Sequence, residues 1–194
     1  MRHNGRSTRL SQSGMKTILG QCLVLTLLIM LPPATAELQP RIIGGENAAE
    51  AAWPATVSLL LRTDYDNALL NNPGDVASAQ YQSHYCAGTL IAPGWILTAA
   101  HCTYDFDNSV HWQPADILIL AGITNLTDTD NNQLRSIVSI SVHPDYNPLT
   151  FESDIALLKL DNDTDPALPP LPLYEGIPPV SGNAIVIGWG DTSN

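Results

Sequence analysis

The feature that most constrains the fold is a series of short apolar segments separated by turn-forming residues, such as the tight turn at Pro93-Gly94. Each segment is rich in β-branched residues or alternates apolar with polar residues, which is typical of strands. No segment shows a long 3.6-residue period, so long amphipathic helices are not expected. Short strands at near-regular spacing predict an all-β fold, an antiparallel sandwich or barrel. The predicted strands cover residues 55–62, 87–92, 95–100, 116–122, 135–143, 155–160 and 183–190.

Two polar stretches interrupt this pattern, and the composition changes after Leu160. Residues 63–83 are predicted to form a surface loop, and residues 103–115 form a second polar insertion. Residues 161–182 are rich in proline, which is typical of an extended and stiff linker. Because a single strand cannot form a core, a linker that leads into one more strand predicts a second domain that this sequence does not contain.

Residues 1–36 are typical of an export signal. Lys16 is followed by an apolar run over residues 18–31, and the Ala-Thr-Ala at residues 34–36 is a cleavage site of the A-x-A kind. The run is shorter than the roughly 20 apolar residues that a membrane-spanning helix needs, so a signal peptide is preferred to a membrane anchor. Met15 stands where such a signal ordinarily starts, so the residues before it are either an extended n-region or upstream of the true start. The mature chain is expected to be secreted, in the extracellular space or the periplasm, and free of the membrane.

The chain that follows the signal is strongly acidic. From Ile42 onward three basic residues stand against eighteen acidic ones, which gives a net charge of −15. Such a surface repels phosphate backbones, so nucleic-acid binding is not expected. Solubility explains the charge, and steering of basic substrates is a second interpretation.

Removal of the signal leaves two cysteines, Cys86 and Cys102. An even pair of cysteines in an exported chain predicts a disulfide. The loop that it closes has about 16 residues, for which the chain-entropy estimate is about 3 kcal/mol. A zinc site would need more nearby ligands than Cys102 and His101, so no metal is expected.

His101 lies directly after an apolar segment, in "LTAAHC" (97–102), and Cys86 lies in "HYCAGTLI" (84–91). A single histidine near a strand end is, by itself, most often a structural residue. Together the two stretches resemble the histidine motif of the trypsin-like serine proteases, which have the chymotrypsin fold. The resemblance implies that His101 is the general base and that Cys102 is bonded to Cys86 on the preceding strand. The family more often has two glycines after that cysteine, whereas Ala87 stands at the first of these positions here.

The stretch "HPDYNPLTFESDIALLKL" (143–160) resembles the aspartate segment of the same family. An aspartate before an apolar strand is, by itself, most often a turn or cap residue. The resemblance implies that Asp154 fixes the imidazole tautomer of His101 and stabilises the imidazolium that forms during attack. His101 precedes Asp154, which is the chain order of the family.

Two further stretches match the family in the same order along the chain. "RIIGG" (41–45) resembles a zymogen activation junction, which implies that cleavage between Arg41 and Ile42 removes residues 37–41 as a short propeptide. "IGWG" (187–190) resembles a stretch early in the family's second barrel. The resemblance therefore implies two antiparallel β-barrels with the catalytic groups in the cleft between them. The expected division of the chain is a first barrel over 42–160, a linker over 161–182 and the first strand of the second barrel over 183–194.

The nucleophile of the family lies in a Gly-Asp-Ser-Gly-Gly turn, and no such string occurs in this sequence. The serines after Asp154 are Ser181 and Ser193. Neither has the flanking residues that would build an oxyanion hole from backbone N–H groups, so neither is assigned as the nucleophile. The nucleophilic serine is expected on the half of the fold that this sequence does not contain.

The resemblance implies a secreted serine endopeptidase, made as a zymogen, that hydrolyses peptide bonds by a Ser-His-Asp mechanism without a cofactor. Its expected partners are protein or peptide substrates and a protease that activates it by cleaving after arginine. Without the serine-bearing half, the chain alone is expected to be inactive. Two alternatives stay open: a catalytically dead homologue that acts as a binding protein, and a truncated or decayed gene with no separate function.

Overall fold

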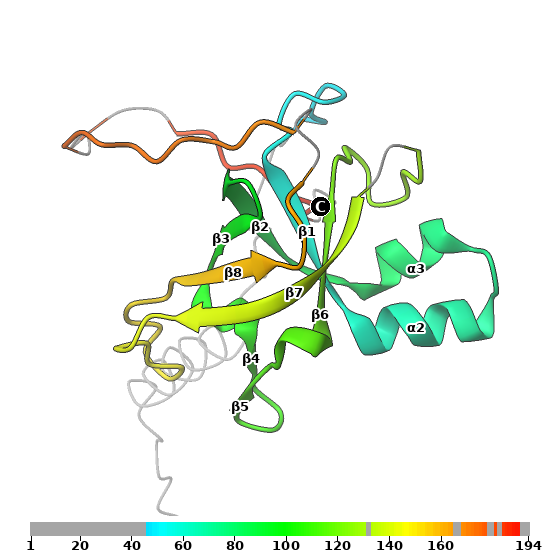
Figure 1. Ribbon diagram of the computed structural model, residues 1–194, viewed down its shortest axis with the longest axis horizontal. Coiled ribbons are helices and arrows are strands. Elements are labelled where there is room, and N and C mark those ends of the chain that lie inside the picture. Colours follow the sequence, from blue (N-terminus) through cyan, green and yellow to red (C-terminus); the bar gives the residue numbers. More distant parts are fainter. Residues whose placement is uncertain (1–45, 131–132, 165–167, 178–180, 182–183, 191–194) are drawn as a thin grey trace, which may run out of the picture. The chain divides into compact units, whose positions relative to one another are not determined.

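Six strands of the chain close into an antiparallel barrel (Figure 1). The structure is a computed structural model, and it describes residues 46–130, 133–164, 168–177, 181 and 184–190. The strands follow one another around the barrel in the order β1-β2-β3-β8-β7-β6, and pairing between β6 and β1 closes it. The barrel strands are β1 (Thr56–Leu61), β2 (His84–Ala92), β3 (Trp95–Thr98), β6 (Ile117–Ala121), β7 (Gln133–Val142) and β8 (Ala156–Leu160).

The six segments predicted as strands between residues 55 and 160 correspond to these six barrel strands. Their apolar residues fill the barrel because successive side chains of a strand point to opposite faces of the sheet. The interior cluster is made of Ala55, Val57, Leu59, Leu90, Ile96, Cys102, Ile117, Ile119, Ala121, Ile137, Leu158 and Leu160. The prediction of an all-β antiparallel fold is confirmed for this part of the chain.

Strand β6 is buried at every position, although only one of its faces points into the barrel. Leu118 and Leu120 point outward and would be exposed if nothing covered them. They belong instead to a second apolar cluster, which lies outside the barrel. This outer cluster comprises Leu60, Tyr65, Ala79, Leu118 and Leu120. Leu60 comes from β1, and Tyr65 and Ala79 come from residues 63–83.

Residues 63–83 do not form the predicted surface loop. They fold into two helices, α2 (Arg62–Asn71) and α3 (Val76–Ser83), which lie side by side (Figure 1). The Asp75 carboxylate caps α3 by accepting a hydrogen bond from the Ser78 backbone N–H at 3.1 Å. The prediction failed because both helices are short and mostly polar. Such helices gain most of their stability from tertiary packing, here on the outer face of β1 and β6, rather than from a periodic pattern.

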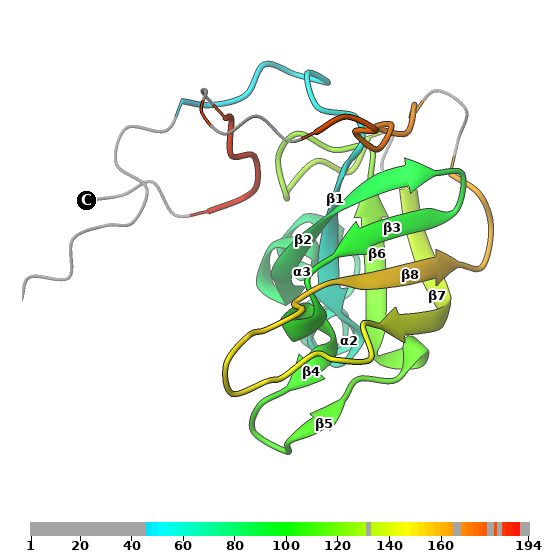
Figure 2. The same cartoon turned by 90° about the vertical axis from the view of Figure 1, so that its left-hand side faces the viewer.

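The second polar insertion, residues 103–115, also has regular structure. Strands β4 (Tyr104–Asp105) and β5 (Val110–His111) form a small hairpin, and the 3₁₀ turn η2 (Pro114–Asp116) leads into β6. The Asp105 carboxylate holds the turn of the hairpin by accepting hydrogen bonds from Asp107 and Asn108. Figure 2 shows that this hairpin lies beside the loop that connects β7 to β8.

Beyond Leu160, the described residues contain no strand, so the strand predicted over 183–190 is wrong for residues 184–190. A strand needs a neighbour to hydrogen-bond with, and in the described part of the chain each of the six barrel strands is already paired with two neighbours. The segment instead contacts the preceding part of the chain through the side chain of Trp189. The Trp189 Nε1–H donates to the Thr124 carbonyl at 2.7 Å, and the Trp189 ring lies edge-on to His84 with the centroids 5.8 Å apart.

Several predicted features lie outside the described residues. These are the export signal over 1–36, the propeptide over 37–41 and the junction between Arg41 and Ile42. Within the described part of the chain, no helix is both long and apolar enough to cross a membrane.

Gly88 of β2 lies too close to β3 to carry a side chain. A Cβ atom at this position would lie 2.7 Å from the Ile96 Cγ2 atom and 3.0 Å from the Leu97 carbonyl oxygen. We therefore expect Gly88→Ala to lower the free energy of unfolding by about 1–3 kcal/mol, as overpacking in a core does. Urea unfolding followed by circular dichroism measures the change.

Gly188→Ala is the matched control, because a Cβ atom there meets nothing within 4 Å. Its free energy of unfolding should stay within about 0.5 kcal/mol of the parent. Equal changes for the two variants would contradict the close approach at Gly88.

Candidate active site

His101 lies in the 3₁₀ turn η1 (Ala100–Thr103), which directly follows β3. The turn is held internally by the Thr103 hydroxyl, which donates to the Ala100 carbonyl at 2.8 Å. It is held to β2 by a disulfide between Cys102 and Cys86, with a Cα–Cα distance of 6.0 Å. The pair of cysteines identified in the sequence is therefore joined next to His101.

A second bond ties the turn to β2. The Tyr85 hydroxyl donates to the Cys102 carbonyl at 2.8 Å. Burial raises the pKa of Tyr85, so this hydroxyl stays protonated and remains a donor at any ordinary pH. The backbone of η1 is thus attached to the neighbouring strand by one covalent bond and one hydrogen bond.

Asp154 reaches the same place through the register of two strands. β3 and β8 pair antiparallel with Thr98 opposite Ala156. Because the strands are antiparallel, two residues onward from Thr98 and two residues back from Ala156 bring Ala100 opposite Asp154, so Asp154 arrives beside η1. The order of the chain and the pairing of these strands are sufficient to bring together two residues that are far apart in sequence.

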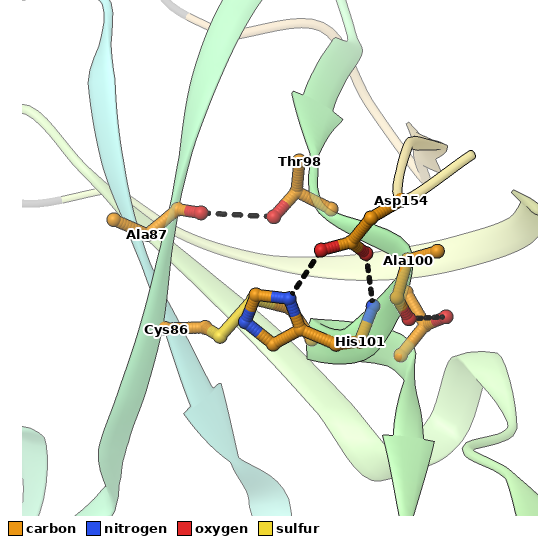
Figure 3. A network of polar contacts seen from close by, with 8 residues as sticks. Cys86, Ala87, Thr98, Ala100, His101 and Asp154 are labelled. Atoms are coloured by element: carbon orange, nitrogen blue, oxygen red, sulfur yellow. Dashed lines mark hydrogen bonds and ion pairs between the residues drawn. A yellow bond between two sulfur atoms is a disulfide. The ribbon is translucent and has the colours of Figure 1, made fainter. Parts of the chain in front are cut away.

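Asp154 binds His101 through two hydrogen bonds (Figure 3). The His101 backbone N–H donates to Asp154 Oδ1 at 2.8 Å, and the ring Nδ1 lies 2.7 Å from Asp154 Oδ2. Because an ionised carboxylate only accepts, the Nδ1 atom carries the proton and the Nε2 atom keeps a free lone pair in the neutral ring. The His101 side chain is 42% exposed and that of Asp154 is 23% exposed, so the imidazole is accessible while the carboxylate lies behind it.

The pKa of Asp154 lies below its ordinary value. Partial desolvation is the largest single effect and raises the pKa. It is outweighed by the hydrogen bond from the His101 side chain, by hydrogen bonds from the backbone N–H groups of His101 and Ala100, and by the charge of the imidazolium. The carboxylate therefore stays ionised in the pH range where histidine titrates.

An aromatic cluster flanks His101. Neither the polar insertions nor the motifs found in the sequence predicted it. The Phe151 ring lies edge-on to the His101 ring, with the centroids 5.9 Å apart, and its other neighbour is Phe106 at 6.0 Å. Tyr104, His111 and Tyr146 complete the cluster. Phe151 has a φ of 57°, a region that bulky residues rarely adopt. The aromatic residues of 103–115 and 146–151 are visible in the sequence, but only the packing of the two loops shows that they meet.

The remaining sequence-derived candidates lie elsewhere. Ser181 is exposed in the segment after the barrel, and Ser193, Arg41 and Ile42 lie outside the described residues. A groove of about 910 Å³ runs beside Trp189, lined by parts of residues 48–56 and 122–135. Its lining includes neither His101 nor Asp154, so it is not the place where the histidine would act.

The structure thus places a histidine and a partly buried aspartate side by side at one end of a closed antiparallel barrel. The family model that matches the chain is Trypsin, over residues 42–194. The chain belongs to this family. Its barrel is the first of the two barrels of the chymotrypsin-like fold, and the chain covers that barrel and part of the second.

Two known proteins illustrate the similarity. The suppressor of tumorigenicity 14 protein homolog of Bos taurus is 31% identical over 163 residues, which cover 79% of this chain and 17% of the bovine protein. The VesB protease of Vibrio cholerae is 29% identical with a TM-score of 0.52, and the match covers 69% of this chain and 34% of the Vibrio chain. The chain thus spans well under half the length of both relatives.

The lowered pKa of Asp154 predicts a pH-dependent contribution to stability. A carboxylate whose pKa is lower in the folded state stabilises the fold above its unfolded pKa of about 3.9, and this contribution is lost as the pH falls through the folded value. We expect Asp154→Asn to unfold at lower urea concentration than the parent chain at pH 5, and the difference to shrink as the pH is lowered below about 4.

Asp145→Asn is the matched control, since Asp145 lies on the same loop with an exposed side chain. It should change the unfolding midpoint little at either pH. A gap between the parent and Asp154→Asn that persists or widens in acid would show that the carboxylate is not stabilised in its ionised form.

Proposed function

We propose that this chain supplies the general base of a secreted serine endopeptidase that hydrolyses peptide bonds by acyl transfer. Membership of the Trypsin family supports the class of reaction. The observation that carries the proposal is the 2.7 Å contact between His101 Nδ1 and Asp154 Oδ2, which leaves Nε2 free to accept a proton. The site needs no metal or cofactor for this chemistry, because the proton moves between side chains and substrate.

In the proposed mechanism, His101 Nε2 takes the proton of a serine hydroxyl while the serine oxygen attacks the carbonyl carbon of the peptide bond. Asp154 remains ionised and stabilises the imidazolium that forms. The imidazolium then gives its proton to the leaving amine, which leaves an acyl group on the serine. In the second half of the reaction a water molecule gives a proton to His101 Nε2 and attacks the acyl group. The imidazolium returns a proton to the serine oxygen, and the carboxylic acid is released.

The serine in this mechanism is proposed to lie on residues outside this sequence, which contains no Gly-Asp-Ser-Gly-Gly string. Residues 1–36 are proposed to direct export, and cleavage between Arg41 and Ile42 by an activating protease is proposed to convert a zymogen into the active form. The sequence pattern of these residues supports both steps. Proteins or peptides are the proposed substrates.

A second candidate is a catalytically silent homologue that binds a partner protein. The observation that favours it is a run of large apolar side chains after the barrel that are 56–91% exposed. These are Leu171, Leu173, Tyr174, Ile177, Ile185 and Val186. Large exposed apolar side chains are typical of interaction surfaces, and the rest of a two-barrel protease would also cover them. Reading the coding sequence beyond codon 194 for a Gly-Asp-Ser-Gly-Gly turn separates the two candidates.

The 194-residue chain alone should not react with a fluorophosphonate probe, because neither Ser181 nor Ser193 has the flanking residues that build an oxyanion hole from backbone N–H groups. A trypsin-family protease in the same reaction provides the positive control, and mass spectrometry of the intact chain measures the labelling. Stoichiometric labelling that disappears in Ser181→Ala or Ser193→Ala would show that the nucleophile is within this chain after all.

In a longer form that carries the serine, His101→Ala should lower kcat by several orders of magnitude and change KM far less, because the general base acts in the transition state. Steady-state hydrolysis of a chromogenic peptide measures both constants. His143→Ala is the matched control, since His143 is exposed on the loop between β7 and β8. Near-normal turnover of His101→Ala would refute the assignment of the base.

A further inference from the structure

Basic residues are almost absent from the chain that follows Arg41. Of the eight Lys and Arg residues in the sequence, all but three lie in residues 1–41, and those three are Arg62, Arg135 and Lys159. Each of them belongs to a helix or a strand: α2, β7 and β8 respectively. The connecting loops and the segment after Leu160 contain none. Beyond Ile42, an endopeptidase that cuts after basic residues therefore meets its possible cleavage sites only inside regular structure.

We propose that from Arg41 onward the folded chain offers endopeptidases that cut after basic residues a single bond, Arg41–Ile42, so that activation is one cut and stops there. The inference rests on the proposed function, which makes this bond the activation junction. Hydrolysis of the bond consumes one water molecule and leaves a carboxylate on Arg41 and an ammonium group on Ile42. The partner is an endopeptidase that recognises arginine before the bond it cuts.

The physical basis of the proposal is the way in which a protease reaches a bond in a folded protein. The residues around the bond have to leave their neighbours before they can enter the active site of the protease. Exposed loop tips do so easily and are the preferred sites of nicking. A bond within a strand or a helix becomes available only when that element opens, so its cleavage follows the small population of the opened state.

Arg62 is fixed by its side chain and by its place in the chain. It begins α2 directly after β1, where Leu61 is paired with Ile117 of β6. Its Nε–H donates to the Ala115 carbonyl at 2.6 Å, and its Nη2 donates to the Ser136 hydroxyl at 3.2 Å. The guanidinium is thus bound to two other parts of the barrel, and a protease would have to break both hydrogen bonds to take this side chain into its pocket.

Arg135 lies within β7 and is half-buried. It is paired with Ile119 of β6, and the carbonyl of the next residue, Ser136, accepts a hydrogen bond from the Asp161 backbone N–H at 3.0 Å. The bond that follows Arg135 is therefore held on both sides. Cleavage there requires β7 to separate from β6 and from the residues that follow β8.

Lys159 lies within β8 and is paired on both sides, with Trp95 of β3 and with Ser139 of β7. Its ammonium group lies 5.1 Å from the centroid of the Trp95 ring and 3.8 Å from Asp163 Oδ1. Exposure of the following bond requires β8 to leave the middle of a closed barrel. The same opening would separate Asp154 from His101, so a chain cut here has already lost the arrangement of its site.

The segment after the barrel is the part of the chain that a protease reaches most easily. Its described residues form no helix or strand, and Leu173, Tyr174 and Ile177 are 61–91% exposed. Glu175 is exposed among them. Residues 160–194 contain no Lys or Arg, so the most accessible segment lacks the residues that the activating protease reads.

The test is limited digestion of the full 194-residue chain with pancreatic trypsin, which cuts after arginine and lysine. Intact-mass measurements at intervals identify the products, and far-ultraviolet circular dichroism records the fold at the start. We expect the fragment of residues 42–194 to accumulate and persist, with cuts after Arg62, Arg135 and Lys159 at least about 100-fold slower than the cut after Arg41. In urea the same three bonds should be cut readily.

A matched pair of variants tests whether the placement of basic residues is what protects the chain. Glu175→Arg puts an arginine into the exposed segment, and we expect its new bond to be cut within about tenfold of the rate at Arg41. Glu175→Gln removes the same carboxylate without adding a basic residue, so its digestion should match that of the parent.

Comparable rates of cutting at Arg41 and at Arg62, Arg135 or Lys159 would overturn the proposal. A chain that does not fold by itself would give this result and counts equally against it. Equal resistance of Glu175→Arg and Glu175→Gln would also overturn it, because the position of the basic residues would then not matter. A chain that is not cut after Arg41 at all would instead refute the activation step of the proposed function, and the single cut with it.

Discussion

The antiparallel pairing between β3 and β8 is the interaction on which the arrangement of the site depends. With Thr98 opposite Ala156, the positions just beyond the ends of these strands bring η1 and Asp154 together. A slip of one residue would turn every side chain of β8 to the other face of the sheet and would move the carboxylate away from His101. Closure of the barrel prevents such a slip, because each strand is held in register by two neighbours.

His101 is consequently positioned from both sides of β3. The disulfide at Cys102 and the hydrogen bond from Tyr85 fix the backbone of η1 to β2, and the two hydrogen bonds to Asp154 fix the backbone and the ring to the start of β8. A long side chain such as histidine loses rotamer freedom when it is held in this way. Three adjacent strands therefore hold the imidazole in place in the folded chain, as the proposed role of general base requires.

The sequence predicted those parts of the molecule that short-range patterns determine. The six barrel strands have alternating or β-branched residues, and His101 and Asp154 stand in recognisable stretches. The helices α2 and α3 were missed because they depend on an apolar patch formed by β1 and β6, which no local pattern reveals. The contact of Phe151 with His101 was missed for the same reason, since it requires two loops to meet. The strand expected near Trp189 failed because a strand is defined by its neighbour and not by its own residues.

The helical connection between β1 and β2 has a consequence for how the barrel forms. These two strands are adjacent in the sheet but are separated by all the residues from Arg62 to Ser83. A flexible connection of that length would have to search for its closed arrangement, and the entropy of closing a loop grows with its length. Short polar helices such as α2 and α3 are held by the strands they pack on, so they cannot close this connection in advance. The entropy lost in joining β1 to β2 is therefore offset only when β6 also pairs with β1 and completes the apolar surface on which the helices pack.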